Sequence, residues 1–170
     1  MLLRVRELAV QMANGIYEST PDRDNAHLEV TALKNQIDLI ASYARFNDIS
    51  LLNGSFSSVD IQAGNTTFET IAVSISTMTQ TGLSITGVSV STQSAAKSAI
   101  TTMDTALETV ATEQATLGSL INRMNFSIAN LSKSSVTTEQ AMGRILDADF
   151  ASETSNLSKH QILNQAATSM

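Results

Sequence analysis

The 170-residue sequence has no cysteine, no tryptophan and one proline, and only 4% of its residues are aromatic. The absence of cysteine excludes disulfide bonds, thiolate metal sites and Cys–His catalysis. The ten basic residues are scattered and the net charge is -6, so the composition does not favour a nucleic-acid-binding surface. No apolar run approaches the ~18 residues that would span a bilayer, so no membrane partner is expected.

Two stretches place apolar residues at alternating steps of four and three, the spacing that keeps one helix face turned toward a partner helix. Such faces pack lengthwise against other long helices, so the pattern predicts a packing element and not a pocket. The shorter stretch comprises Ala26, Val30, Leu33, Ile37, Ile40 and Ala44. The longer one comprises Ala96, Ile100, Met103, Leu107, Val110, Gln114, Leu117, Ile121, Met124, Ile128 and Leu131.

Gln114 is the one polar member of the longer stretch. Two interpretations remain open. The amide is simply tolerated near the middle of a long helix, or it fixes the register of packing, because a polar residue at a core position penalises misaligned partners.

The periodicity predicts helices over residues 1–14, 24–45, 93–132 and 138–170, with a turn over 15–22. Asn14-Gly15 should cap the first helix at its C-terminus, and Asp22 or Asp24 should cap the second at its N-terminus. Residues 132–136 should form a weak break. Interruptions are also expected at 147–149 and 153–156 in the last helical region.

Alternating apolar residues between these helices predict a β-hairpin that pairs residues 58–63 with 69–76. Asn47-Asp48 and Asn53-Gly54 mark turns before it. Ile85, Val88 and Val90 suggest a further short strand, with Gly82 and Gly87 as breakers. The predicted fold class is therefore mainly α with a small β-hairpin region.

The helix predicted over 93–132 would be ~60 Å long, whereas a compact chain of this size would be roughly 40 Å across. The sequence therefore predicts an elongated bundle of long antiparallel helices. Helical patterns run into both chain ends, so the chain is expected to be truncated at each. A tail that lacks its natural partner should be loosely held, and we expect this of residues 155–170.

No constellation of catalytic or metal-ligating residues is evident. His27 and His160 lie far apart within helical patterns and are expected to be solvated. Asp147 and Asp149 are two residues apart, so on a helix their side chains would point different ways, and a capping or hinge role is expected. No serine lies in a nucleophile elbow. We predict no enzymatic activity, no cofactor and no metal.

Five segments, in the right order, resemble bacterial flagellin. They are RVRELAVQMANG (4–15), IDLIASYARFNDISLLNGS (37–55), VDIQAGNTTFETIAVSI (59–75), TLGSLINRMNFSIANL (116–131) and ILDADFASETSNLSKHQILNQAATSM (145–170). One departure is Asp48, where the family has a glycine after Asn.

The resemblance implies a structural subunit of the flagellar filament, secreted and self-assembling for motility. It implies an inner helical domain at 1–149, with its β-hairpin region at about 47–92, and the start of the C-terminal polymerisation helix at 150–170. The family's outer domain would be reduced to a short linker at 76–92. Implied partners are neighbouring flagellin copies, an export chaperone for the C-terminal region and a host Toll-like receptor.

The resemblance also assigns receptor contacts to Arg4, Leu8 and Glu29, with Gln11 nearby. Arg4 and Leu8 are four residues apart and so share one helix face. From the residues alone, the simpler interpretation is that Leu8 belongs to the core and Arg4 is a solvated charge.

Two alternative functions share part of this pattern. A hook–filament junction protein shares the terminal-helix design but should match the RVRELAVQ segment and the hairpin less closely. A coiled-coil signalling or adhesion module would share the seams but would not explain the hairpin that separates them.

Overall fold

A computed structural model describes residues 1–17, 21–146 and 150–169. The chain divides into two compact units, Met1–Asn125 and Phe126–Met170. The division falls inside a helix, whereas the predicted domain boundary at 149/150 lies at the edge of a segment outside the described residues. Asp147 and Asp149 lie in that same segment, so their predicted capping or hinge role is outside the described residues too.

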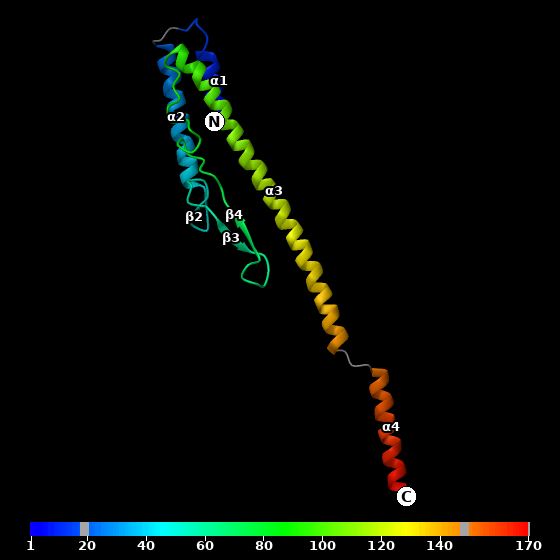
Figure 1. Ribbon diagram of the computed structural model, residues 1–170. Helices are drawn as coiled ribbons and strands as arrows, with labels where there is room; N and C mark the ends of the chain where they lie inside the picture. Colours follow the sequence, from blue (N-terminus) through cyan, green and yellow to red (C-terminus); the bar gives the residue numbers. More distant parts are fainter. Residues whose placement is uncertain (18–20, 147–149, 170) are drawn as a thin grey trace. The chain divides into compact units, whose positions relative to one another are not determined.

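Four helices and four short strands make up the described chain, in the order α1 (Leu2–Met12), α2 (Asp22–Tyr43), β1 (Arg45–Phe46), β2 (Ile49–Ser50), β3 (Val59–Gln62), β4 (Thr70–Val73), α3 (Gln93–Leu146) and α4 (Phe150–Ser169). The predicted fold class, mainly α with a small β-hairpin region, is confirmed. Within the first unit, α1 runs opposite to α2 and α3, while α2 and α3 run in the same direction (Figure 1).

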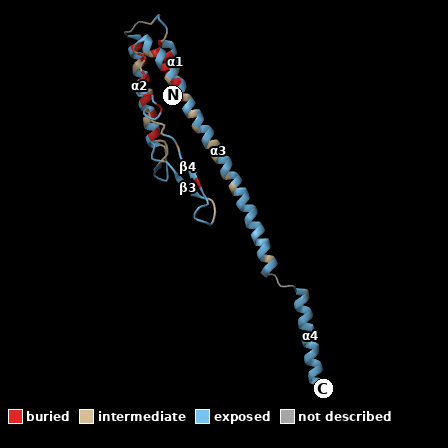
Figure 2. Cartoon of the chain, in the orientation of Figure 1, coloured by how far each residue is buried: buried red, intermediate tan, exposed pale blue. Residues whose placement is uncertain are grey.

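The core of the first unit lies where α1, α2 and the N-terminal part of α3 meet, as the buried residues in Figure 2 show. It also takes in the segment that returns the chain from β4 to α3. Its buried members are Val5, Leu8, Ala9, Met12, Ala26, Val30, Ile37, Leu83, Ile85, Val88, Val90, Ala96, Ala99, Met103 and Ala106. Three of the four members from α3 are alanines, and such small side chains let helix backbones approach closely.

The predicted breaks inside the C-terminal helices are wrong. α3 continues through residues 132–136 as far as Leu146, and α4 continues through 153–156. Hydroxyl groups in these stretches bond back to the preceding turn, as Thr137 Oγ1 does to the Lys133 carbonyl at 2.9 Å and Thr154 Oγ1 to the Phe150 carbonyl at 2.5 Å. Ser- and Thr-rich sequence therefore remains helical here.

The C-terminal cap predicted for the first helix and the N-terminal cap predicted for the second are also wrong. α1 ends at Ala13 in an ordinary right-handed conformation, and Gly15 does not adopt a positive φ. α2 has Pro21 at its N-cap position, so Asp22 and Asp24 fall inside the first turn, where their charges complement the helix dipole without capping it.

The predicted hairpin over 58–63 and 69–76 is confirmed as β3 paired antiparallel with β4, in the register Val59 opposite Val73 and Ile61 opposite Ile71. Only β4 buries its apolar side chains; Val59 and Ile61 on β3 remain exposed. The strand expected at Ile85, Val88 and Val90 is not formed. That segment makes turns, yet all three side chains are buried.

The Asn47-Asp48 turn joins β1 and β2 as a second, two-residue hairpin. Both residues have positive φ, 49° at Asn47 and 63° at Asp48, the combination that a type I′ turn requires. The departure from the family's glycine at position 48 therefore leaves the turn geometry intact, although an aspartate tolerates this backbone conformation less well than glycine.

We expect Asp48→Gly to raise the free energy of unfolding by about 0.5–1 kcal/mol, because glycine adopts positive φ without a Cβ penalty. Loss of the exposed ion pair between Arg45 and Asp48 should cost little. Urea unfolding measures the difference. Asp60→Gly, within β3, is the matched control and should destabilise; a loss at position 48 equal to that at position 60 would refute the prediction.

Candidate functional site

The longer apolar stretch, from Ala96 to Leu131, lies on α3 and is called the α3 seam; its environment changes along the helix. Near the helix N-terminus, Ala96 and Met103 are wholly buried, and Ile100 and Val110 pack against the core. Leu107, Leu117 and Met124 are half-buried. Ile121, Ile128 and Leu131 are exposed to 57%, 64% and 44%. The predicted seam is thus a packing surface within the first unit as far as Val110, and an apolar surface open to solvent beyond it.

Gln114 lies in the exposed part of the seam. It lines an open apolar groove of about 320 Å³ in the first unit, together with aliphatic side chains of α2 and α3 such as Ile37, Ile40 and Leu117. An amide at the mouth of a groove keeps access to water, so its position carries no burial cost here.

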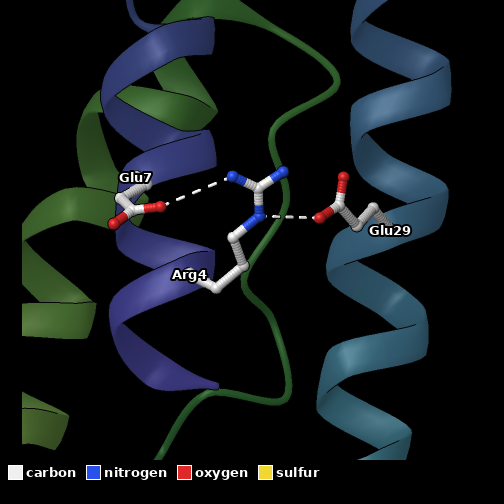
Figure 3. Close-up of polar contacts among 3 residues, drawn as sticks. All are labelled: Arg4, Glu7 and Glu29. Carbon is white, nitrogen blue, oxygen red and sulfur yellow. Dashed lines mark hydrogen bonds and ion pairs between the residues drawn. The ribbon is translucent and has the colours of Figure 1, made fainter.

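Arg4 and Glu29 are brought together across the α1–α2 contact, although 25 positions separate them in the sequence. Arg4 Nε donates to Glu29 Oε1 at 2.8 Å, and Arg4 Nη1 lies 3.4 Å from Glu7 Oε2 (Figure 3). The hydrogen bond to Glu29 is the main reason why the pKa of Arg4 is raised above its ordinary value. The three side chains form an exposed charged cluster, which we call the Arg4 cluster.

The other two residues assigned to receptor contact differ in exposure. Leu8 is only 4% exposed and packs in the core, as the residue pattern alone suggests. Gln11 is exposed and its Nε2 donates to Tyr17 Oη at 3.3 Å. On the face that these residues share, the polar side chains are therefore exposed to solvent, whereas Leu8 is buried in the core.

A second ion pair ties α1 to α3. Arg6 Nε lies 2.5 Å from Asp104 Oδ1, and both side chains are about half exposed. Together with Arg4 and Glu29, this pair places one charged contact on each side of α1. Exposed ion pairs of this kind contribute little to the free energy of unfolding. We therefore expect these two pairs mainly to fix the orientation of α1.

Sequence reasoning missed a set of polar side chains on α2 that hold irregular backbone. Arg23 is buried and donates to the carbonyls of Met12, Asn14 and Tyr17. The free carbonyls after α1 are thus satisfied by a side chain from the next helix, in place of a glycine cap. The spacing of Arg23 on the buried face of α2, in phase with Ala26 and Val30, was the available signal.

Lys34 and Asp38 hold the segment between β4 and α3 in the same way. Lys34 Nζ donates to the carbonyls of Thr86 at 2.8 Å and Val88 at 3.0 Å, and the Asp38 carboxylate accepts from Gln80 N and Nε2. Burial lowers the pKa of Lys34 below its ordinary value, because the charged form loses hydration.

The two histidines differ. His160 is exposed, as predicted, but His27 is half-buried and its Nδ1 has no hydrogen-bond partner among the described residues. Across residues 1–17, 21–146 and 150–169, no group of three or more His, Asp or Glu side chains is placed to hold a metal ion. No helix in those ranges is both long and apolar enough to cross a membrane.

Comparison with known families gives two matches. Residues 1–57 match the bacterial flagellin N-terminal helical region, and residues 100–170 match the bacterial flagellin C-terminal helical region. The two matched regions include α1 and α2 at one end of the chain, and most of α3 with α4 at the other.

Curated relatives align along the whole chain. Flagellin FlaB1 of Treponema pallidum is 34% identical over 186 residues, and flagellar filament core protein flaB2 of Brachyspira hyodysenteriae is 36% identical over 185 residues. Each alignment covers 100% of this chain and 65% of the relative, so the chain spans about two thirds of the relatives' length. Neither relative is named for an enzymatic activity, in agreement with the prediction of no catalysis.

Solved structures show the same fold. The crystal structure of Bacillus cereus flagellin aligns with a TM-score of 0.65 at 32% identity, covering 76% of this chain and 74% of that one. FliC from Burkholderia pseudomallei aligns with a TM-score of 0.61 at 18% identity, covering 72% and 92%, and supports the fold alone.

Proposed function

Because this chain belongs to the bacterial flagellin family, we propose that it forms part of a structural subunit of the bacterial flagellar filament, assembled outside the cell from copies of itself for motility. The observation that carries the proposal is the α3 seam. Apart from Gln114, its apolar spacing continues after Val110, where Ile121, Ile128 and Leu131 are exposed. An apolar helix face of this kind is a packing surface without a partner inside the chain.

The test is assembly. Seeded polymerisation of the purified intact subunit that contains this chain, viewed by negative-stain electron microscopy, should give long filaments. Short caps or junction pieces would favour the hook–filament junction alternative, and isolated dimers would favour a coiled-coil interaction module.

We expect Ile128→Glu to abolish or strongly reduce filament formation. Burying an isoleucine in an interface contributes roughly 1.5–3 kcal/mol, and a buried unpaired carboxylate opposes it further. Asn130→Glu, which adds the same charge at an exposed position off the seam, is the matched control. Filaments of normal length and yield from Ile128→Glu would contradict the role of the seam.

We make three further proposals about the C-terminal region. The C-terminal region, with α4, binds an export chaperone. Residues 150–170 begin the polymerisation helix, and residues 155–170 are loosely held in the isolated protein. The described side chains of α4 are all exposed, which supports all three proposals, because none of them is buried against the rest of the chain. Amide exchange in dilute protein tests the third proposal: strong protection throughout residues 155–170 would contradict it.

A second function is recognition by the flagellin-sensing Toll-like receptor, through Arg4, Leu8, Gln11 and Glu29. Support comes from the Arg4 cluster, which places Arg4 and Glu29 on one exposed surface. Because Leu8 is 4% exposed, its contribution would be mainly to support that surface, and Leu8→Ala would change both folding and binding.

We expect Arg4→Ala to weaken binding of the receptor ectodomain by about tenfold, the scale of a single charged interface contact. Arg45→Ala, which removes an exposed guanidinium elsewhere, is the control. The double swap Arg4→Glu with Glu29→Arg separates the two roles of the pair, since it keeps an ion pair between α1 and α2 but exchanges the charges. A swap that restores binding would show a purely structural role and refute receptor contact.

A further inference from the structure

Asn53 and Gly54 occupy an exposed connection between β2 and β3 that requires glycine at its second position. Gly54 has φ +92°, and a Cβ there would lie 2.4 Å from Thr77 Oγ1. The positive φ therefore strongly favours glycine at position 54, and a Cβ there would also require the Thr77 hydroxyl to move. The Asn-Gly dipeptide, in which the least hindered backbone nitrogen follows an asparagine, is fixed by the fold.

The Asn53 side chain is held in a specific conformation. Its Oδ1 accepts hydrogen bonds from Ser55 N at 3.0 Å and from Ser55 Oγ at 2.7 Å. The ring closed by the first bond is an Asx turn, and it contains both Asn53 Cγ and Gly54 N, the two atoms that would form a bond. Among the described residues, no acceptor makes a hydrogen bond with the Gly54 N–H.

We propose that Asn53 is an intrinsic deamidation site of the folded protein, at which the Gly54 nitrogen is the nucleophile and Ser55 activates the side-chain amide. Hydroxide removes the proton from Gly54 N, and the nitrogen forms a bond to Asn53 Cγ. The negative charge that develops on Oδ1 is stabilised by the two Ser55 donors, as in an oxyanion hole.

The leaving group is the side-chain nitrogen. The bond between Cγ and Nδ2 breaks, Nδ2 takes a proton from water, and ammonia departs from a five-membered succinimide. Water then adds to one of the two ring carbonyls and opens the ring to aspartate or isoaspartate. The net reaction consumes one water for each ammonia released, and needs no other reactant.

A second Asn-Gly pair in the chain gives an internal comparison. Asn14 is also exposed and also precedes a glycine, but its Oδ1 accepts a single longer bond, from Ile16 N at 3.3 Å. With one donor in place of two, the same chemistry should be slower at Asn14 than at Asn53.

Deamidation would alter the region around the hairpin. The loop that carries Asn53 is tied to the segment after β4 by the bonds Met78 N to Leu52 O at 2.8 Å and Ile75 N to Phe56 O at 3.1 Å. Deamidation places a new carboxylate between these two hydrogen bonds. The isoaspartate form also adds one carbon to the backbone there. The inference does not depend on the proposed function, because it concerns the chemistry of the folded chain alone.

The experiment incubates the full chain in mildly alkaline buffer and follows each asparagine by peptide mapping with mass spectrometry, with isoaspartate quantified by enzymatic methylation. We expect conversion at Asn53 about threefold faster than at Asn14, and about tenfold faster than at Asn65, which precedes a threonine. Conversion at Asn53 no faster than at Asn14 would overturn the proposal.

Ser55→Ala removes one donor and should slow conversion at Asn53 about threefold. Ser55→Thr keeps the hydroxyl and should restore the rate, while Ser57→Ala, in the same loop, is the control. The Ser55 hydroxyl also lies 3.3 Å from the Ser50 carbonyl, so the circular dichroism of each variant is compared first. An unchanged or faster rate in a folded Ser55→Ala protein would overturn the role of Ser55, and with it the proposal.

Discussion

Replacing Arg23 by alanine is expected to lower the free energy of unfolding by about 3 kcal/mol, measured by urea unfolding with far-UV circular dichroism. Arg23 is 4% exposed, and its guanidinium donates to the carbonyls of Met12, Asn14 and Tyr17. Alanine would leave these carbonyls at the end of α1 without their donor. Hydrogen bonds to a charged group contribute ~1.5–3 kcal/mol each, but three bonds to one side chain do not add fully.

Two variants separate the hydrogen bonds from the charge. Arg23→Lys keeps the charge, but an ammonium group lacks the planar fork that serves several carbonyls at once, so about half of the loss should remain. Arg45→Ala removes an exposed arginine and should change the free energy of unfolding by less than ~0.5 kcal/mol. A loss below ~1 kcal/mol for Arg23→Ala would show that water replaces the guanidinium at these carbonyls.

Periodicity predicted the elements whose stability comes from a continuous apolar face. The helix now seen as α2, the first part of α3 and the pairing of β3 with β4 all follow from the spacing of apolar residues. The same reasoning ended the long helix at 132, because serine and threonine favour caps and turns. The sequence does not show that the Thr137 hydroxyl instead donates to the Lys133 carbonyl within the helix.

The candidate site was predicted in part. The family resemblance, and not the residue pattern, selected Arg4 and Glu29, and the structure brings these two charges within 2.8 Å. The helical spacing of Arg23 indicates that it is buried, but nothing in the sequence indicates that it reaches back to α1 or that Lys34 reaches 52 positions forward to Thr86. Such contacts depend on tertiary packing, because the partners are backbone carbonyls that carry no sequence signal.

The segment between β4 and α3 shows why burial and secondary structure must be predicted separately. The apolar residues Ile85, Val88 and Val90 suggested a strand, but the backbone instead closes turns, for example where Ile85 N donates to the Gln80 carbonyl at 2.9 Å. The side chains are nevertheless buried. The family resemblance suggested a short linker here, whereas these residues form part of the core.

Ile85→Ala is therefore expected to lower the free energy of unfolding by about 3–4 kcal/mol, as much as truncation in a helix core. Ile85 is 0% exposed and among the largest fully buried side chains of the described chain. The loss combines the transfer free energy of the removed carbons with the cost of the cavity left behind. Denaturant unfolding of the purified protein measures it.

Ile16→Ala is the matched control, since Ile16 is 84% exposed and the same truncation there should change the free energy of unfolding by less than ~0.5 kcal/mol. Ile85→Val, which removes one methyl group, should cost about 1 kcal/mol. If Ile85→Ala lowered the free energy of unfolding no more than Ile16→Ala, the segment between β4 and α3 would be a loop that can move away from the helices. A graded loss from valine to alanine would instead require that α1, α2 and α3 pack around Ile85 as a fixed part of the core.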